Sequence, residues 1–229
     1  MIRTTRNLFP LMAFIAFGAA CSDSGTGPID LPELKHDPIL FVHGYGRSKG
    51  NFSEMIASFK ADGWQDNELY AYDYSFTTSN AVNAQEIRDQ INGIVAATGA
   101  TKVDIVAFSI GSVSSRYYLK TLGGDARADA WVSLGGPNHG TDTAINCSNL
   151  FMPCTEILPG STFLAALNSG DETPGLPRYA TWRSPCDATI NPDESVVLAG
   201  ATNNETACIA HLQLLVDRPT YVQVRDFVD

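Results

Sequence analysis

Residues 103–121 read VDIVAFSIGSVSSRYYLKT, and this stretch decides the fold. Its first six residues are the most strand-like run of the chain, and residues 110–121 predict a helix that follows without a turn residue between them. The only residue between strand and helix is Ser109, with the small residues Ala107 and Gly111 two positions before and after it. A serine held in a sharp strand-to-helix turn needs small neighbours at those positions, so the context predicts a nucleophile elbow. The alternative is a small-residue turn without chemistry.

Strand and helix signals alternate around this stretch from residue 38 onward. Such alternation predicts βαβ units, and therefore an α/β fold whose mostly parallel sheet carries helices on both faces. The stretch 136–177 breaks the rhythm with five prolines, and long irregular segments in compact domains are usually functional. The further predicted strands are 39–42, 69–74, 128–134, 179–182 and 196–199, and the further predicted helices are 51–62, 80–97, 209–216 and 218–228.

The N-terminus is typical of an export signal. Two arginines precede an apolar stretch, residues 8–20, which ends in small residues directly before Cys21. This pattern predicts a signal peptide over residues 1–20, followed either by acylation of Cys21 as in bacterial lipoproteins or by ordinary cleavage near Ala20. Residues 21–37 are rich in Ser, Asp, Gly and Pro and predict a tether, so the folded domain is expected to span residues 38–229.

Composition excludes some function classes. The formal net charge is -10, and the chain has 15 Lys and Arg residues against 25 Asp and Glu residues. Nucleic acid needs clustered basic residues, so it is not expected as a partner, whereas a neutral ester or lipid substrate is compatible with this charge. The cysteine and histidine spacings contain no metal-binding pattern, so we expect neither a metal site nor a cofactor.

A glycine-rich loop follows the first predicted strand. It reads Val42-His43-Gly44-Tyr45-Gly46. Acyl-transfer enzymes of this kind stabilise the oxyanion with the N–H of the residue after the nucleophile and with an N–H from such an earlier loop. These donors are expected to be Ile110 and Tyr45. His43 precedes Ser109 and is interpreted as a structural side chain that holds the loop.

Residues 38–46, 107–111, 135–141 and 183–215 together resemble the small bacterial lipases of lipase class 2 and are similar to the minimal Bacillus lipase A group. The resemblance implies an α/β-hydrolase fold in a minimal form without a large lid. It also implies a serine hydrolase that acts on esters without a cofactor. Phe108 departs from the Bacillus group, which has His at that position. The segment that holds Cys147 and Cys154 is more similar to actinobacterial relatives.

The catalytic base is chosen between two histidines downstream of Ser109. The α/β-hydrolase chain order is serine, acid, histidine. His211 lies near the C-terminus, where both this order and the resemblance place the base. His139 lies in the Gly135–Thr141 loop and is interpreted as a loop-packing residue.

The acid is expected to follow a strand between Ser109 and His211. Asp187 comes shortly after the predicted strand 179–182, and the resemblance implies the acid at this position. Asp193 is the second choice, and a surface carboxylate is the alternative for each. Two further carboxylates, Asp142 and Asp171, fall in the irregular stretch.

Four cysteines remain when Cys21 is set aside, and export would allow all four to oxidise. If Asp187 and His211 touch, the adjacent cysteines are also close, which favours a Cys186–Cys208 disulfide. The pair Cys147–Cys154 would then form locally and staple the apolar loop 150–152.

The sequence thus predicts an exported serine carboxylic ester hydrolase, a lipase or esterase, that acts through Ser109, Asp187 and His211. We expect a monomer that is secreted or anchored to the cell envelope through Cys21. The same chemistry would also suit a cutinase-like polyesterase, a thioesterase or an acyltransferase. A non-catalytic lipoprotein that binds lipid is the alternative from a different class.

Overall fold

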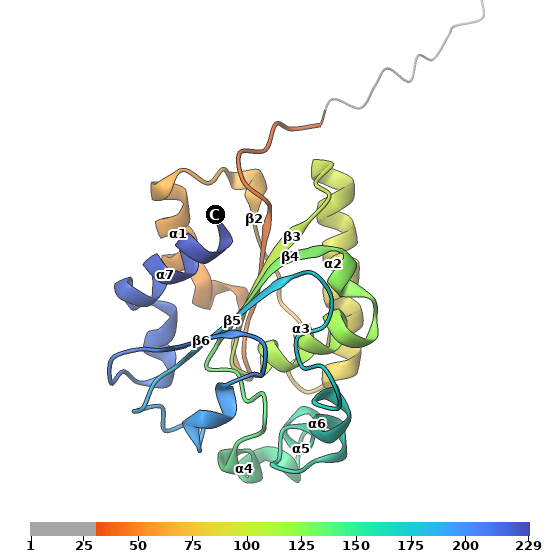
Figure 1. Cartoon of the computed structure of the whole chain (residues 1–229), viewed down its shortest axis with the longest axis vertical. Helices are drawn as coiled ribbons and strands as arrows, with labels where there is room; N and C mark the ends of the chain where they lie inside the picture. The colour runs from red at the N-terminus through yellow and green to blue at the C-terminus, as the bar shows by residue number, and fades with distance from the viewer. Residues whose placement is uncertain (1–30) are drawn as a thin grey trace, which may run out of the picture. The chain divides into compact units, whose positions relative to one another are not determined.

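In the computed structural model, which describes residues 31–229, six strands pair in parallel in the order β2-β1-β3-β4-β5-β6 (Figure 1). The central pair is β3 and β4, so the strand that ends at Ser109 lies in the interior of the sheet. The strands are β1 (Ile39–Val42), β2 (Leu69–Ala71), β3 (Val103–Phe108), β4 (Ala128–Leu134), β5 (Arg178–Arg183) and β6 (Thr202–Glu205).

Helices cover both faces of this sheet. Figure 1 shows α1 and α7 on one side and α2 and α3 on the other. Ile39 and Phe41 of β1 join the core of the first side, and Leu40 and Val42 join the core of the second, because side chains alternate along a strand. This explains why β1 is a continuous apolar run. The covering helices are α1 (Ser53–Asp62), α2 (Asn80–Thr98), α3 (Ile110–Thr121) and α7 (Arg218–Val228).

The irregular stretch 136–177 forms short helices beyond the carboxyl ends of the strands (Figure 1). Its apolar side chains pack on Ile110 and Val113 of α3, which gives this part of the chain a small core of its own. Glu156 anchors it to the start of α2 by accepting hydrogen bonds from the Asn80 N–H (2.7 Å) and from the Asn80 side chain (2.8 Å). The short helices are α4 (Ile145–Ser148), α5 (Met152–Glu156) and α6 (Thr162–Leu167).

The observed architecture confirms the predicted α/β-hydrolase fold in its minimal form. Apart from the covering helices α1, α2, α3 and α7, residues 31–229 add only short helices and loops to the sheet. Short 3-10 turns connect several of the main elements: η1 (Lys49–Phe52), η2 (Asp66–Glu68), η3 (Gly124–Ala126), η4 (Asp142–Ala144), η5 (Asp193–Val196) and η6 (His211–Leu215).

The predicted strand 196–199 is wrong, and the sixth strand is β6 instead. Leu198 is fully buried, which explains the apolar pattern, but its backbone bonds to a side chain rather than to a neighbouring strand. The Leu198 N–H donates to Asn203 Oδ1 (3.0 Å), and the Asn203 amide donates back to the Leu198 carbonyl (2.9 Å). β6 is an edge strand of polar, mostly exposed residues, so it lacks the apolar signal that a buried strand gives.

Two further predicted elements are shorter than expected. The predicted strand 69–74 ends at Ala71, because the Tyr74 N–H donates to His43 Nε2 (3.3 Å) and the chain leaves the sheet. The predicted helix 209–216 is the 3-10 turn η6.

The predicted signal peptide, most of the predicted tether and Cys21 lie outside the described residues. Within the described part, the chain contacts the domain before residue 38. The His36 N–H donates to Glu68 (3.0 Å), and the His36 ring stacks on Trp64 with ring centroids 3.8 Å apart. Across residues 31–229, no helix is both long and apolar enough to cross a membrane.

Candidate active site

Ser109 occupies a strained turn between β3 and α3. It has a φ of 55°, the only positive φ of a non-glycine residue in residues 31–229. Such a backbone conformation costs on the order of 1–3 kcal/mol and persists only where the surroundings enforce it. A Cβ on Gly44 would lie 2.8 Å from the Ser109 Cβ, and a Cβ on Gly111 would lie 2.5 Å from the His43 carbonyl oxygen. The turn therefore requires the small neighbours that the sequence provides.

Asp187 and His211 come together at the carboxyl end of β5. The His211 Nδ1 lies 2.6 Å from Asp187 Oδ2, and the Asp187 side chain is 1% exposed. The other carboxylate oxygen of Asp187 accepts hydrogen bonds from the N–H groups of Thr189 (2.8 Å) and Ile190 (3.0 Å). Asp187 is thus fixed on both oxygens and orients the imidazole through Nδ1, which leaves Nε2 without a hydrogen-bond partner in residues 31–229.

The second ring nitrogen of His211, Nε2, makes no contact of this kind. This atom is buried and has no hydrogen-bond partner within residues 31–229. Ser109 and His211 line the same cavity of about 390 Å³, together with Tyr45 and Phe108. A direct hydrogen bond between Ser109 and His211 is absent from the described residues. Catalytic hydrogen bonds are often long in ligand-free enzymes and shorten when the substrate binds.

Phe108 and Gly135 surround the imidazole. The Phe108 ring lies 4.6 Å from that of His211, centroid to centroid. A Cβ on Gly135, which has a φ of +56°, would lie 3.0 Å from both Cε1 and Nδ1 of His211. Gly135 therefore gives the ring the space it occupies.

The loops that carry Asp187 and His211 are tied together in two ways. The Cys186–Cys208 disulfide joins them with 4.9 Å between the Cα atoms. The buried Ser184 hydroxyl donates to the Ile209 carbonyl (2.6 Å) and accepts from the N–H groups of Ile209 (3.0 Å) and Cys186 (3.2 Å). Sequence reasoning missed Ser184, because a serine after a strand has no signal of its own in a single sequence. Both favoured cysteine pairs, including Cys147–Cys154, are bonded in the structure.

Asp193, the second-choice acid, bonds to a residue other than His211. It forms an ion pair with Arg183, which also pairs with Glu205. The two other carboxylates bond elsewhere: Asp142 accepts from the Asn191 side chain (3.4 Å) and Asp171 from the Thr173 N–H (2.9 Å). The structure therefore brings only Asp187 to the imidazole of His211.

His43 is buried and occupied on both ring nitrogens. Its Nδ1 donates to the Gly44 carbonyl (2.9 Å), and its Nε2 accepts from the Tyr74 N–H (3.3 Å). The ring also stacks on Tyr74 at 4.1 Å. Burial lowers the pKa of His43, so the neutral ring is favoured. These contacts fix the loop before Tyr45, in agreement with a structural interpretation of His43.

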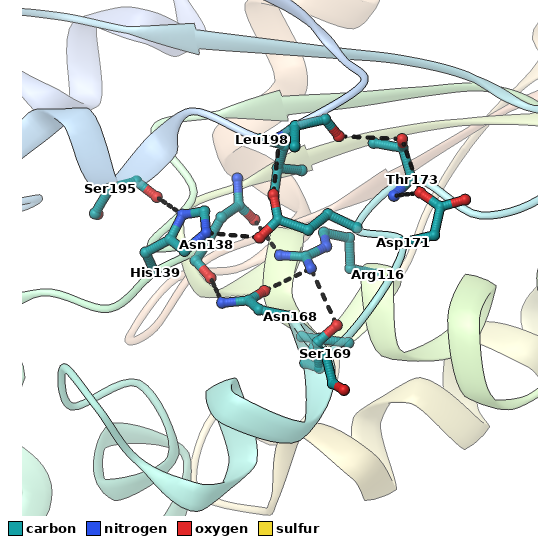
Figure 2. Close-up of polar contacts among 12 residues, drawn as sticks. Arg116, Asn138, His139, Asn168, Ser169, Asp171, Thr173, Ser195 and Leu198 are labelled. Atoms are coloured by element: carbon teal, nitrogen blue, oxygen red, sulfur yellow. Dashed lines mark hydrogen bonds and ion pairs between the residues drawn. The ribbon is translucent and has the colours of Figure 1, made fainter.

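His139 takes part in a different polar cluster, which Figure 2 shows with Asn138, Ser195 and Arg116. Its Nε2 lies 2.8 Å from Glu172 Oε1, and its backbone N–H donates to the Ser195 carbonyl (2.9 Å). Arg116 is buried in this cluster and donates to Asn168 (2.7 Å). Burial lowers the pKa of Arg116 to about 10. His139 thus packs the loop against residues 172 and 195.

The two expected oxyanion donors border the same cavity system as Ser109. Tyr45 and Ile110 both line a second, smaller cavity that also reaches Ser109. Neither of their backbone N–H groups has a hydrogen-bond acceptor within residues 31–229. Ile110 begins α3, so its N–H also carries the positive end of the helix dipole. In the described chain, no group of three or more His, Cys, Asp or Glu side chains could hold a metal ion.

Known proteins share both the family pattern and the fold. The family model described as lipase (class 2) matches residues 36–206, a span that contains Ser109 and Asp187 and ends before His211. Lipase BlEst2 from Bacillus licheniformis, in its mature form, is similar in structure with a TM-score of 0.74 and 18% sequence identity, over 88% of this chain and 96% of that chain.

Two further solved structures show the same fold. Aspergillus fumigatus lipase B has a TM-score of 0.72 and 16% identity, over 87% of this chain and 54% of that chain. The α/β hydrolase MGS-MChE2, from a lagoon-sediment metagenome, has a TM-score of 0.61 and 15% identity, over 85% of this chain and 90% of that chain.

Proposed function

The chain belongs to the class 2 lipase family and is a hydrolase of the α/β-hydrolase fold. From this we propose that it hydrolyses carboxylic esters, with Ser109 as the nucleophile, His211 as the base and Asp187 as the acid that orients His211. One observation carries the proposal: the 2.6 Å contact between Asp187 and His211 leaves an unpaired Nε2 in the cavity that Ser109 lines. A loop-packing histidine would have both nitrogens bonded, as His43 does.

The first half of the reaction forms an acyl-enzyme. The Ser109 Oγ attacks the ester carbonyl carbon while His211 Nε2 takes the hydroxyl proton. The carbonyl oxygen becomes an oxyanion, which accepts hydrogen bonds from the N–H groups of Tyr45 and Ile110. Asp187 stabilises the imidazolium through Nδ1. His211 then gives its proton to the departing alkoxide, and the carbon–oxygen bond to the alcohol breaks.

The second half regenerates the enzyme by the same groups. Water takes the place of the alcohol, His211 removes a proton from it, and the resulting nucleophile attacks the acyl-enzyme carbonyl. The bond between the acyl carbon and Ser109 Oγ then breaks, His211 returns the proton to Ser109 Oγ, and the carboxylic acid leaves. The unpaired N–H groups of Tyr45 and Ile110 suit this role, because donors that are already free do not have to break a bond as charge develops.

Hydrolysis of a p-nitrophenyl ester tests the proposal. Ser109→Ala is expected to lower kcat/KM by about a thousandfold or more, because the members of a catalytic triad act as a unit. Ser169→Ala is the matched control, since Ser169 is exposed and its hydroxyl makes no hydrogen bond within residues 31–229. Equal activity in the Ser109 variant and its control would overturn the proposal.

A second pair of variants tests the acid. Asp187→Ala is expected to abolish most turnover, because the imidazole loses the carboxylate that orients it. Asp193→Ala removes a carboxylate that pairs with Arg183 instead, so it is expected to change kcat only a few-fold. A greater loss in Asp193→Ala would assign the acid to that residue.

We further propose that the protein is exported and acts as a monomer on a neutral ester or lipid, either secreted or held at the cell envelope through Cys21. The support lies in the sequence of residues 1–21 and in the negative net charge. Thioesters, polyesters and acyl acceptors other than water belong in the same substrate panel, because a triad of this kind serves all of these reactions.

A further inference from the structure

Two cavities of different character meet at Ser109. The wider one, of about 390 Å³, is lined by His211 and Phe108. The narrower one, of about 190 Å³, lies against Ile110, Ala144 and Ile157. Ser109 and Tyr45 line both, so a carbonyl carbon bound at Ser109 would have one substituent in each cavity.

The position of the imidazole decides which substituent goes where. In the proposed reaction the departing alkoxide receives its proton from His211, so the alcohol must lie within hydrogen-bond reach of that ring. His211 lines the wide cavity and not the narrow one. The alcohol side of the ester therefore belongs in the wide cavity, and the acyl chain extends from the carbonyl carbon into the narrow one.

The narrow cavity has the chemistry of an acyl site. Its apolar residues are almost fully buried: Ile110 is 3% exposed and Ala144 is 2% exposed. Two hydroxyls of its lining are bonded within the protein. The hydroxyls of Thr141 and Thr143 both donate to the Thr189 carbonyl, at 2.8 Å and 2.6 Å. Buried apolar residues together with these bonded hydroxyls favour a hydrocarbon over water along this wall.

The volume of the narrow cavity sets a length limit. An apolar cavity of about 150 Å³ holds the six carbons of benzene, or about 25 Å³ per carbon. At 190 Å³ the narrow cavity holds about seven to eight carbons by the same scale. The Cys147–Cys154 disulfide forms part of its lining and keeps α4 and α5 together, so the wall is fixed covalently rather than free to open.

We propose, on the basis of the ester hydrolysis proposed above, that the narrow cavity is the acyl site and that it selects acyl chains of about eight carbons. Each methylene buried there is expected to raise kcat/KM by about fourfold until the cavity is full. For p-nitrophenyl esters from acetate to dodecanoate, kcat/KM is then expected to rise up to octanoate and to rise no further beyond it.

Variants of the lining test the assignment. Ala144→Leu adds three carbons to the cavity and is expected to lower the octanoate-to-butanoate ratio of kcat/KM by about 60-fold. Ile157→Val removes one carbon and is expected to raise the decanoate-to-octanoate ratio by about fourfold. This opposite shift keeps the test informative if Ala144→Leu folds poorly. Ala188→Leu, in the wide cavity, is the matched control and is expected to leave the chain-length ratios unchanged.

Failure of the acyl-site proposal differs from failure of the proposed function. Ester hydrolysis that depends on Ser109 but whose chain-length ratios stay fixed in Ala144→Leu and Ile157→Val, or move with Ala188→Leu instead, would overturn the acyl site alone. Absence of hydrolysis across the whole ester series would overturn the proposed function, and the acyl site with it.

Discussion

The Cys186–Cys208 disulfide ties the loop of Asp187 to the loop of His211, and its removal is a test of what positions the catalytic pair. Changing both cysteines to serine releases a loop with a sequence separation of 22 residues. Loop entropy predicts a loss of about 3 kcal/mol in the free energy of unfolding. For a domain of this size, that loss corresponds to a Tm lower by about 10 °C.

Activity is expected to fall with stability, but by less than on loss of a triad member. The Ser184 hydroxyl continues to bridge Ile209 and the N–H of residue 186 when the disulfide is gone. Because small displacements of reacting groups cost up to about a hundredfold, we expect kcat/KM to fall by about tenfold.

A matched control is the double change of Cys147 and Cys154 to serine. That disulfide has a sequence separation of 7 residues, so the same expression predicts a smaller loss of about 2 kcal/mol. Its removal is expected to change chain-length preference more than overall turnover, because the bond lines the acyl cavity. Urea unfolding followed by tryptophan fluorescence gives the stabilities, and p-nitrophenyl butyrate hydrolysis gives kcat/KM.

Two outcomes would refute this reasoning. Unchanged kcat/KM after loss of the Cys186–Cys208 bond would show that the disulfide does not position Asp187 and His211. A stability loss no larger than that of the control would show that loop entropy does not govern its contribution.

Three further predictions follow from other contacts. Gly135→Ala places a Cβ about 3.0 Å from the His211 ring at a φ of +56°, so kcat is expected to fall by about a hundredfold. The circular dichroism spectrum is expected to stay unchanged, and an unaltered kcat would contradict the role of Gly135. Burial would raise the pKa of Glu172, but hydrogen bonds from the Ala199 N–H and from His139 hold the pKa below its ordinary value of 4.5. Glu172 therefore stabilises the fold at a pH above 4.5 and loses this contribution as the pH falls from 4.5 through the lower pKa of the folded protein. The wild type is therefore expected to unfold at a higher urea concentration than Glu172→Gln at pH 7, with a gap that closes toward pH 3; a gap independent of pH would refute this. Cys21→Ser is expected to move the protein from the envelope fraction to the medium in fractionation followed by immunoblotting, and mass spectrometry that finds an unmodified N-terminus other than Cys21 would contradict acylation.

The fold and the site could be predicted from the sequence where one short stretch carries both the buried residues of a strand and the small residues of a catalytic turn. The run through Ser109 combines a fully buried strand with small residues on both sides of the serine, and both features follow from the demands of a tight turn. The predicted strands include the four whose side chains are mostly buried, β1, β3, β4 and β5, and also the half-buried β2. β6 was not predicted, because an exposed edge strand needs no apolar residues. Residues 196–199 were wrongly predicted as a strand, because buried apolar side chains also occur in loops.

Features of the site that depend on tertiary contacts were harder to predict from the sequence. The chain order and the family resemblance suggested the pair of Asp187 and His211, but only the fold shows the bonds that hold it, such as those of the Ser184 hydroxyl. The space that Gly135 leaves for the imidazole depends on a residue far away in sequence. The volume of the acyl cavity depends on side chains from four separate segments, which no local pattern records.

Covalent labelling of the nucleophile tests the central claim most directly. A fluorophosphonate probe reacts with a serine only where a base and an oxyanion site activate it, so labelling reports the assembled site rather than the presence of a serine. Peptide mapping of the labelled protein is expected to find one modified residue, Ser109, with labelling lost in His211→Ala. A label on another serine, no label at all, or full labelling in His211→Ala would contradict the account.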